Sequence, residues 1–166
     1  MKHEGQSGES VFLELLSDKY ILDYLSAFSC TVQEMVRVAD IGSEYCYLQE
    51  RLVKQQDKKT VFYCVFDGLD KNCIGAIEIR DGIEHAGQLY CWLNEHYWGT
   101  GLFTRAMCLA SHSYFVQSGA PFFTAHVDKN NKRSYYALKK CGFADQGIVK
   151  GPRGAQYQLV LRRKLY

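Results

Sequence analysis

The stretch HYWGTGLFTRA, residues 96–106, places Gly99 and Gly101 between an apolar alternating run and a long helical run. At such a junction the first amides of the helix have no backbone partner, and glycine lets the loop curl so that several amides face one point. The helix dipole favours an anion at that point. The loop lacks the Gly-Lys-Ser/Thr of a Walker motif and the third glycine of a dinucleotide-binding fold. On its own it therefore favours a tight turn over a diphosphate site.

A second motif, NNKRSYYALKKCGF at residues 130–143, changes that balance. Asn131 and Ser134 lie three positions apart at the start of a predicted helix, and Gly142 and Phe143 close it. By itself this is an amphipathic helix with a polar start and a glycine stop. The two motifs in this order, each preceded by a strand, are more specific than either motif alone.

The surrounding pattern predicts an α+β domain. Apolar alternation and β-branched runs predict strands over residues 11–16, 60–66, 73–80, 88–94 and 122–128, and a final hairpin around the turn at 151–154. Helical spacing predicts helices over residues 20–28, from 31, over 43–54, from 102 to the stop at 118–121, and over 131–141. The second helix would start on Thr31, because TVQE reads as a capping box. This order fits a three-layer α/β/α fold built on a mostly antiparallel sheet.

Length and composition bound the class of protein. The chain has 166 residues, 47% of them hydrophobic, and a formal net charge of +2. These values predict one domain over residues 1–166, with residues 1–10 frayed, and argue against a nucleic-acid or membrane partner. No stretch resembles a signal peptide or a membrane span of about 20 apolar residues, which predicts a cytoplasmic protein. Seven cysteines, an odd number without a CxxC pair, predict neither a disulfide framework nor a metal site.

Together the two motifs resemble those of the GNAT superfamily of acetyl-CoA-dependent N-acetyltransferases, in particular the ribosomal-protein N-terminal acetyltransferases and their small-molecule-modifying relatives. That branch reads Y-W-G-x-G-x-x-T-E-A and then N-x-x-S-x-x-x-L-x-K-x-G-F. The matching residues are Tyr97, Trp98, Gly99, Gly101, Thr104 and Ala106, and then Asn131, Ser134, Leu138, Lys140, Gly142 and Phe143. The resemblance covers roughly the last half of the chain. It implies a GNAT-like mixed sheet that is splayed at its centre.

The resemblance also implies where acetyl-CoA binds. The acetyl-carrying arm would enter between the strands at residues 88–94 and 122–128, and the backbone amides of residues 96–102 would hold the pyrophosphate. A strand amide near Leu93 would polarise the thioester carbonyl, and Asn131 would orient the cofactor. The implied cofactor-binding residues are Leu93, Asn94, His96, Trp98, Gly99, Thr100, Gly101, Leu102, Asn131 and Ser134.

The general acid is predicted from a position at which this chain departs from the family pattern. Many GNAT enzymes carry a tyrosine four residues before the glycine of Gly-Phe, and this chain has Leu138 there. The prediction therefore moves to Ser134, with Tyr135 and Tyr136 as the next candidates.

Three further departures leave the general base open. His96 replaces the usual Gln or Arg of the phosphate loop, Arg105 replaces a Glu, and Gln88, which cannot act as a base, stands where relatives carry Glu.

Four residues remain as candidates for moving the substrate proton. Glu78 is the first carboxylate candidate, Glu95 the second and Glu84 a weaker one, each of which could equally be a surface carboxylate. His126 is either a proton relay or a half-buried strand residue. A chain of water molecules would also serve.

The predicted function is acetyl transfer from acetyl-CoA to a primary amine by direct attack in a ternary complex. The acceptor would be a peptide or protein N-terminus or a small amine, and the protein a monomer or homodimer. The alternative is a non-catalytic acyl-CoA-binding or interaction module on the same fold. Specificity would come from residues 20–55 and the last hairpin, and an acidic cleft there would point to polyamines or cationic peptides.

Overall fold

The computed structural model describes residues 10–56, 60–81 and 86–164. The strands are β1 (Val11–Leu15), β2 (Thr60–Asp67), β3 (Cys73–Asp81), β4 (Gly87–Leu93), β5 (Phe122–Asp128), β6 (Ala144–Gly151) and β7 (Gly154–Arg162). The α-helices are α1 (Ile21–Ala27), α2 (Cys30–Val36), α3 (Ile41–Gln56), α4 (Leu102–Ser118) and α5 (Lys132–Lys140). Short 3-10 turns lie at η1 (Asp18–Tyr20) and η3 (Glu95–Tyr97). The frayed segment predicted for residues 1–10 falls outside the described residues except for the last of them.

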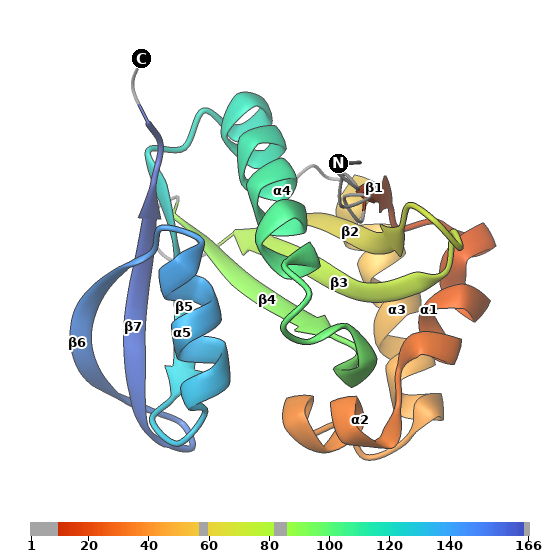
Figure 1. Cartoon of the computed structure of the whole chain (residues 1–166), viewed down its shortest axis with the longest axis horizontal. Coiled ribbons are helices and arrows are strands. Elements are labelled where there is room, and N and C mark those ends of the chain that lie inside the picture. Colours follow the sequence, from red (N-terminus) through yellow and green to blue (C-terminus); the bar gives the residue numbers. More distant parts are fainter. Residues whose placement is uncertain (1–9, 57–59, 82–85, 165–166) are drawn as a thin grey trace, which may run out of the picture.

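The strands form one sheet in the order β1-β2-β3-β4-β5-β7-β6. Every neighbouring pair is antiparallel except β4 and β5, which run parallel. Those two strands pair only at Gly87 with Phe123 and at Gln88 with Thr124, and they diverge beyond that point (Figure 1). The predicted α+β fold with a centrally splayed, mostly antiparallel mixed sheet is confirmed.

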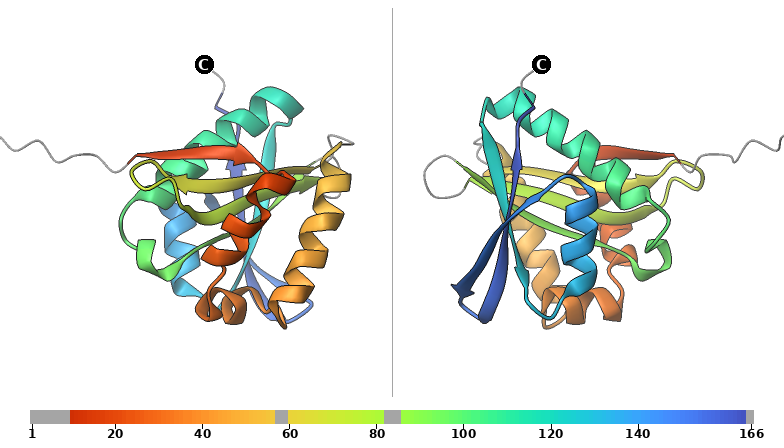
Figure 2. Two further views of the ribbon diagram at one scale, coloured as in Figure 1. Left: turned by 90° about the vertical axis from the view of Figure 1, so that its right-hand side faces the viewer. Right: turned by 60° about the vertical axis from the view of Figure 1, so that its left-hand side comes forward.

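Helices cover both faces of this sheet (Figure 2). One apolar core joins α4 and α5 to the sheet through residues such as Met107, Phe123 and Leu138. The other core joins helices α1, α2 and α3 to the opposite face of the sheet, through residues such as Tyr24 and Leu48. Because strand side chains alternate between faces, odd-numbered residues of β4 face the α4 side and even-numbered ones face the α1–α3 side.

The predicted capping box at the start of α2 is wrong. Ser29, not Thr31, is the N-cap of this helix, and its hydroxyl oxygen accepts a hydrogen bond of 3.2 Å from the amide of Val32. The Ser29 hydroxyl also donates to Glu95 Oε2 at 2.6 Å. This tertiary contact ties the start of α2 to η3, a partner that the local sequence pattern does not reveal.

Candidate functional site

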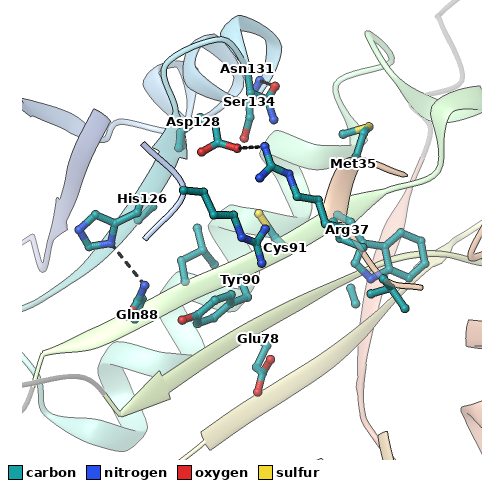
Figure 3. Close-up of a pocket in the computed structure, with 18 of the residues that line it drawn as sticks. Met35, Arg37, Glu78, Gln88, Tyr90, Cys91, His126, Asp128, Asn131 and Ser134 are labelled. Atoms are coloured by element: carbon teal, nitrogen blue, oxygen red, sulfur yellow. Dashed lines mark hydrogen bonds and ion pairs between the residues drawn. The ribbon is translucent and has the colours of Figure 1, made fainter. Parts of the chain in front are cut away.

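A cleft of about 900 Å³ opens where β4 and β5 diverge. Its walls come from both strands, from β3, from α1 to α3, from α5 and from the β6–β7 turn. Figure 3 shows Gln88 and Tyr90 of β4 facing His126 and Asp128 of β5 across this space. The cleft therefore joins the second motif, through Asn131, Ser134 and Leu138, to the segments that were predicted to set specificity.

The divergence leaves one edge of β4 without a strand partner. The amide of Asn94 donates to Ile74 O at 2.8 Å, toward β3. Neighbouring residues of a strand direct their backbone groups to opposite edges, so the amides of Cys91 and Leu93 point to the edge that β5 has left. These amides are open to an oxygen that enters the gap, and the role of the amide near Leu93 stays a prediction.

The glycine loop has the geometry of an anion cradle. Gly99 and Gly101 have φ angles of +77° and +85°, and a Cβ added to either would meet no atom within 4 Å. Within the described residues, the amides of Gly99, Thr100 and Gly101 donate to no protein group. Three free amides beside the start of a 17-residue helix fit a diphosphate.

The first part of the predicted cradle is occupied by its own chain. The amide of His96 donates to Asn94 Oδ1 at 3.1 Å, and that of Trp98 donates to Glu95 O at 3.2 Å. The Leu102 amide makes a long contact of 3.4 Å with Thr100 Oγ1. Of the amides of residues 96–102 that were predicted to hold a phosphate, those of residues 99–101 are therefore available. The Leu102 amide, whose contact is long, is the next candidate.

A cation that sequence reasoning missed lies over this loop. The Arg133 guanidinium stacks on the Trp98 ring at 3.6 Å from its centroid, and Trp98 Nε1 donates to Leu93 O at 2.9 Å. The contact joins the start of α5 to the loop across the gap. Arg133 thus supplies positive charge near the position where His96 replaces the longer donor of relatives.

The start of α5 brings Asn131 and Ser134 into the cleft. Asn131 caps the helix, because its side-chain oxygen accepts a hydrogen bond of 3.1 Å from the Ser134 amide. The Ser134 hydroxyl has no partner among the described residues. Tyr136 is 61% exposed and lies outside the cleft lining. Tyr135 is also outside the lining and donates to Asp145 Oδ2 at 2.7 Å. Of the three candidate acids, Ser134 alone faces the cleft.

Glu78 lies at the base of the cleft within a charged network. Its side chain is 3% exposed and forms ion pairs with Arg80 at 3.0 Å and Arg51 at 3.5 Å. It also accepts from the Tyr47 hydroxyl, and Arg80 in turn stacks on Tyr90 at 3.7 Å. Because its oxygens are already engaged by two cations and a hydroxyl, Glu78 is better placed to hold the cleft wall than to accept a proton.

The remaining predicted proton carriers lie in different places. Glu95 sits beside the glycine loop, where it accepts from Ser29, and it does not line the cleft. Glu84 lies outside the described residues. His126 does line the cleft, with Nδ1 3.3 Å from Gln88 Nε2 (Figure 3). The contact orients the imidazole ring toward Gln88, and the tautomer of His126 decides which of the two groups donates.

A family profile described as "Acetyltransferase (GNAT) domain" matches residues 9–144. The chain belongs to the GNAT acetyltransferase family. The residues that match the GNAT profile span the elements from β1 to α5, including both motifs and the divergence of β4 from β5. The predicted family and the predicted acetyltransferase class are confirmed. Family membership favours the enzyme over the non-catalytic module.

Solved GNAT acetyltransferases share the fold. An acetyltransferase from Salmonella typhimurium that modifies the N-terminal serine of the 50S ribosomal subunit protein L7/L12 has a TM-score of 0.83 at 12% identity, over 93% of this chain and 96% of that one. The aminoglycoside acetyltransferase AAC(6')-Ib, solved with coenzyme A, has 0.76 at 18% identity over 93% and 95%. The microcin C7 self-immunity acetyltransferase MccE, solved with acetyl-CoA and AMP, has 0.77 at 15% identity over 92% of each chain. No curated protein sequence matches the chain.

Two further observations on this GNAT chain concern a membrane-spanning helix and a metal site. No helix in the described residues has the length and apolar character to cross a bilayer. Across residues 10–56, 60–81 and 86–164, no cluster of three or more His, Cys, Asp or Glu side chains could hold a metal ion.

Glu44 is a second site residue that sequence reasoning missed. It lies in the first turn of α3, is 5% exposed and lines the GNAT cleft. Trp92 Nε1 donates to the Tyr24 hydroxyl at 3.0 Å, and that hydroxyl donates to Glu44 Oε1 at 2.5 Å. Burial raises the pKa of Glu44 above its usual 4.5, the nearby charge of Glu78 adds to this, and the Tyr24 hydrogen bond partly offsets it.

We expect the raised pKa of Glu44 to make the free energy of unfolding depend on pH. Because the folded chain holds the Glu44 proton more tightly than the unfolded chain, the contribution of Glu44 to stability falls as pH rises from about 4.5 through the folded pKa. Glu44→Gln should therefore become progressively more stable relative to wild type as pH rises, in urea unfolding followed at pH 4.5 to 8. A difference that stays constant over this range would show that the carboxyl titrates as it does in the unfolded chain.

Proposed function

We propose that this GNAT acetyltransferase moves the acetyl group of acetyl-CoA to a primary amine in the cleft where β4 and β5 diverge. The observation that carries the proposal is the joining of three features at one opening. The free amides of Gly99 to Gly101 follow Trp98, which Arg133 contacts from the start of α5, the free edge of β4 lines the gap, and Ser134 faces into the cleft. This arrangement supports binding of both substrates at once, with direct attack in a ternary complex.

The residues of the glycine loop and of the cleft would each bind a different part of acetyl-CoA. The amides of Gly99, Thr100 and Gly101 hold the diphosphate, and Arg133 adds a cation beside them. Asn131 orients the arm that carries the thioester. The Leu93 amide donates to the thioester carbonyl oxygen, where negative charge develops as the amine attacks.

Bond changes set the two proton transfers. The acceptor nitrogen forms a bond to the acetyl carbon while the bond from that carbon to sulfur breaks. The nitrogen loses a proton, and the departing thiolate gains one. The Ser134 hydroxyl is the proton donor to the sulfur and recovers its proton from water.

Glu44 is the proton acceptor that the cleft best supports. Of the three carboxylates that line it in the described part of the chain, Glu78 and Asp128 are paired with arginines, whereas Glu44 is bonded only by the Tyr24 hydroxyl. A carboxylate with a raised pKa is the better base near neutral pH. It would take the amine proton directly or through water.

Acetyl-CoA titration followed by measurement of thiol release against a panel of primary amines tests this function. Saturable binding with amine-dependent thiol release is expected. Binding with no turnover on any amine would favour the non-catalytic module, and no binding at all would contradict both.

Ser134→Ala is expected to lower kcat about tenfold to 100-fold, because thiolate departure loses its proton donor. The KM for acetyl-CoA should change little, since the hydroxyl is not among the groups that hold the diphosphate. Ser134→Thr keeps a hydroxyl and should recover part of the rate. Steady-state kinetics by thiol release measures this, and equal kcat for Ser134→Ala and wild type would remove Ser134 from the reaction.

Several finer points stay predictions. They are a cytoplasmic location, a monomeric or homodimeric state, a single domain over residues 1–166 and the lack of nucleic-acid or membrane partners. A small amine and a peptide N-terminus both stay predicted acceptors.

A further inference from the structure

Every carboxylate on the acceptor side of the cleft already has a partner. Asp128 accepts from Arg37 at 3.0 Å on one oxygen and from Gln156 at 3.4 Å on the other. Glu78 is held by two arginines, and Glu44 by the Tyr24 hydroxyl. An incoming substrate therefore meets no carboxylate without a hydrogen-bond or ion-pair partner among the described residues of the lining.

Two cations of the same lining have no partner. Lys150 and Arg153 are exposed, lie at the β6–β7 turn and form no ion pair or hydrogen bond with their side chains within the described residues. The Arg37 guanidinium lies on the same rim (Figure 3), bound to Asp128. The rim of the cleft at the β6–β7 turn is thus positively charged.

The positive rim continues outward. A second hollow of about 610 Å³ shares Met35, Arg37, Asp128, Asn131 and Arg153 with the cleft. Lys129 and Arg133 also line it, against Glu34 as its other carboxylate. Arg153 lies where the two hollows meet, so a group bound there would be part of a molecule that reaches into the cleft.

We propose that the acceptor is an amine that also carries an anionic group, and that Arg153 and Lys150 bind this anion while the amine enters the cleft. The proposal rests on the proposed function and names the class of its acceptor. Carboxylate and phosphate share the chemistry that a guanidinium recognises, so both are candidate anions.

The same charges disfavour a polycationic acceptor. A polyamine or a lysine-rich peptide would place its second cation against Arg153 and Lys150, and like charges brought together at a binding site weaken association. The cleft is not acidic in the way that would have pointed to polyamines. The positive rim also raises the rate at which anions reach the cleft, an effect that falls with salt.

The test compares acceptors that differ only in charge. Three peptides with amidated C-termini, Ser-Asp-Asp-Gly, Ser-Asn-Asn-Gly and Ser-Lys-Lys-Gly, are assayed by thiol release, together with phosphoethanolamine, glycine and spermidine. We expect kcat/KM for the aspartate peptide to exceed that for the lysine peptide about tenfold at low salt, and the ratio to shrink in 0.5 M salt, roughly as screening requires. The peptide and small-molecule arms separate the two sources of the anion.

Matched variants locate the effect. Arg153→Ala should bring the aspartate-to-lysine ratio close to one, and Arg153→Lys should retain most of it. Arg163→Ala removes an exposed cation beyond the far end of β7 and should leave the ratio unchanged. Equal or faster turnover of the lysine peptide and spermidine, or an unchanged ratio in Arg153→Ala, would overturn the proposal.

A binding measurement keeps the two proposals apart. Calorimetric titration of the CoA-loaded protein with the three N-acetylated peptides reports charge preference without turnover. Tighter binding of the acidic product supports the anion site even if no amine is acetylated, in which case the proposed function fails alone. Equal binding of all three products contradicts the anion site even if acetylation occurs.

Discussion

The Gly101→Glu variant is expected to bind acetyl-CoA at least about 100-fold more weakly than wild type. Gly101 is the N-cap of α4, and its amide is one of the three that lack a protein partner in the described chain. A glutamate there sets a carboxylate beside the diphosphate, and like charges in a binding site cost several kcal/mol, roughly enough for this loss. The φ of +85° adds strain of about 1–2 kcal/mol for a residue with a Cβ.

Two controls separate charge from strain. Gly101→Ala carries only the strain and should lose at most about tenfold in affinity. Gly119 caps the other end of α4 with a φ of +65°, and a Cβ there would also meet nothing within 4 Å. Gly119→Glu therefore introduces the same charge and a similar strain at the far end of the helix, and should bind acetyl-CoA as wild type does. Isothermal titration gives the three affinities, and unchanged binding by Gly101→Glu would refute the cradle.

The parts of the site that are encoded locally were predictable from the sequence. The glycine loop and the Asn131-to-Phe143 motif depend on neighbours within one helical turn, and the structure places both at the divergence of β4 and β5. Strand alternation likewise predicted the elements of the sheet. Local pattern could not say that the amides of His96 and Trp98 would be taken up by η3, because that turn forms between residues the pattern treats as loop.

The parts that depend on distant partners were not predictable. Glu44 acquires its raised pKa from burial and from the charge of Glu78, which lies on another element, and nothing around Glu44 in the sequence marks it. Arg133 meets Trp98 only because α5 lies against the loop after β4. Glu78 was a candidate base as a carboxylate on a predicted strand, whereas the structure surrounds it with arginines from α3 and β3.

Glu78→Gln is expected to lower the free energy of unfolding by about 3 kcal/mol, because removing one partner of a buried ion pair leaves the others uncompensated. Arg51 and Arg80 would both lose their buried counter-charge. Glu78 Oε1 and the two arginine Nε atoms are buried without well-aligned hydrogen bonds, so their attraction depends on charge that a glutamine cannot supply. Chemical denaturation measures the loss. Glu50→Gln, which removes a carboxylate that is 53% exposed and paired with Lys54, should cost less than about 0.5 kcal/mol.

The same variant decides between the two roles considered for Glu78. If Glu78 holds the wall of the cleft, kcat of the folded Glu78→Gln protein should stay within about tenfold of wild type, and its pH–rate profile should keep its shape. Replacing Arg80 with Met in the Glu78→Gln background should recover part of the lost stability, because one uncompensated, partly buried cation is removed. If instead Glu78 accepts the amine proton, the folded Glu78→Gln protein would lose kcat by about 100-fold or more and flatten the acid limb. The network of Tyr47, Arg51 and Arg80 around the carboxylate favours the first outcome, and leaves proton transfer to Glu44.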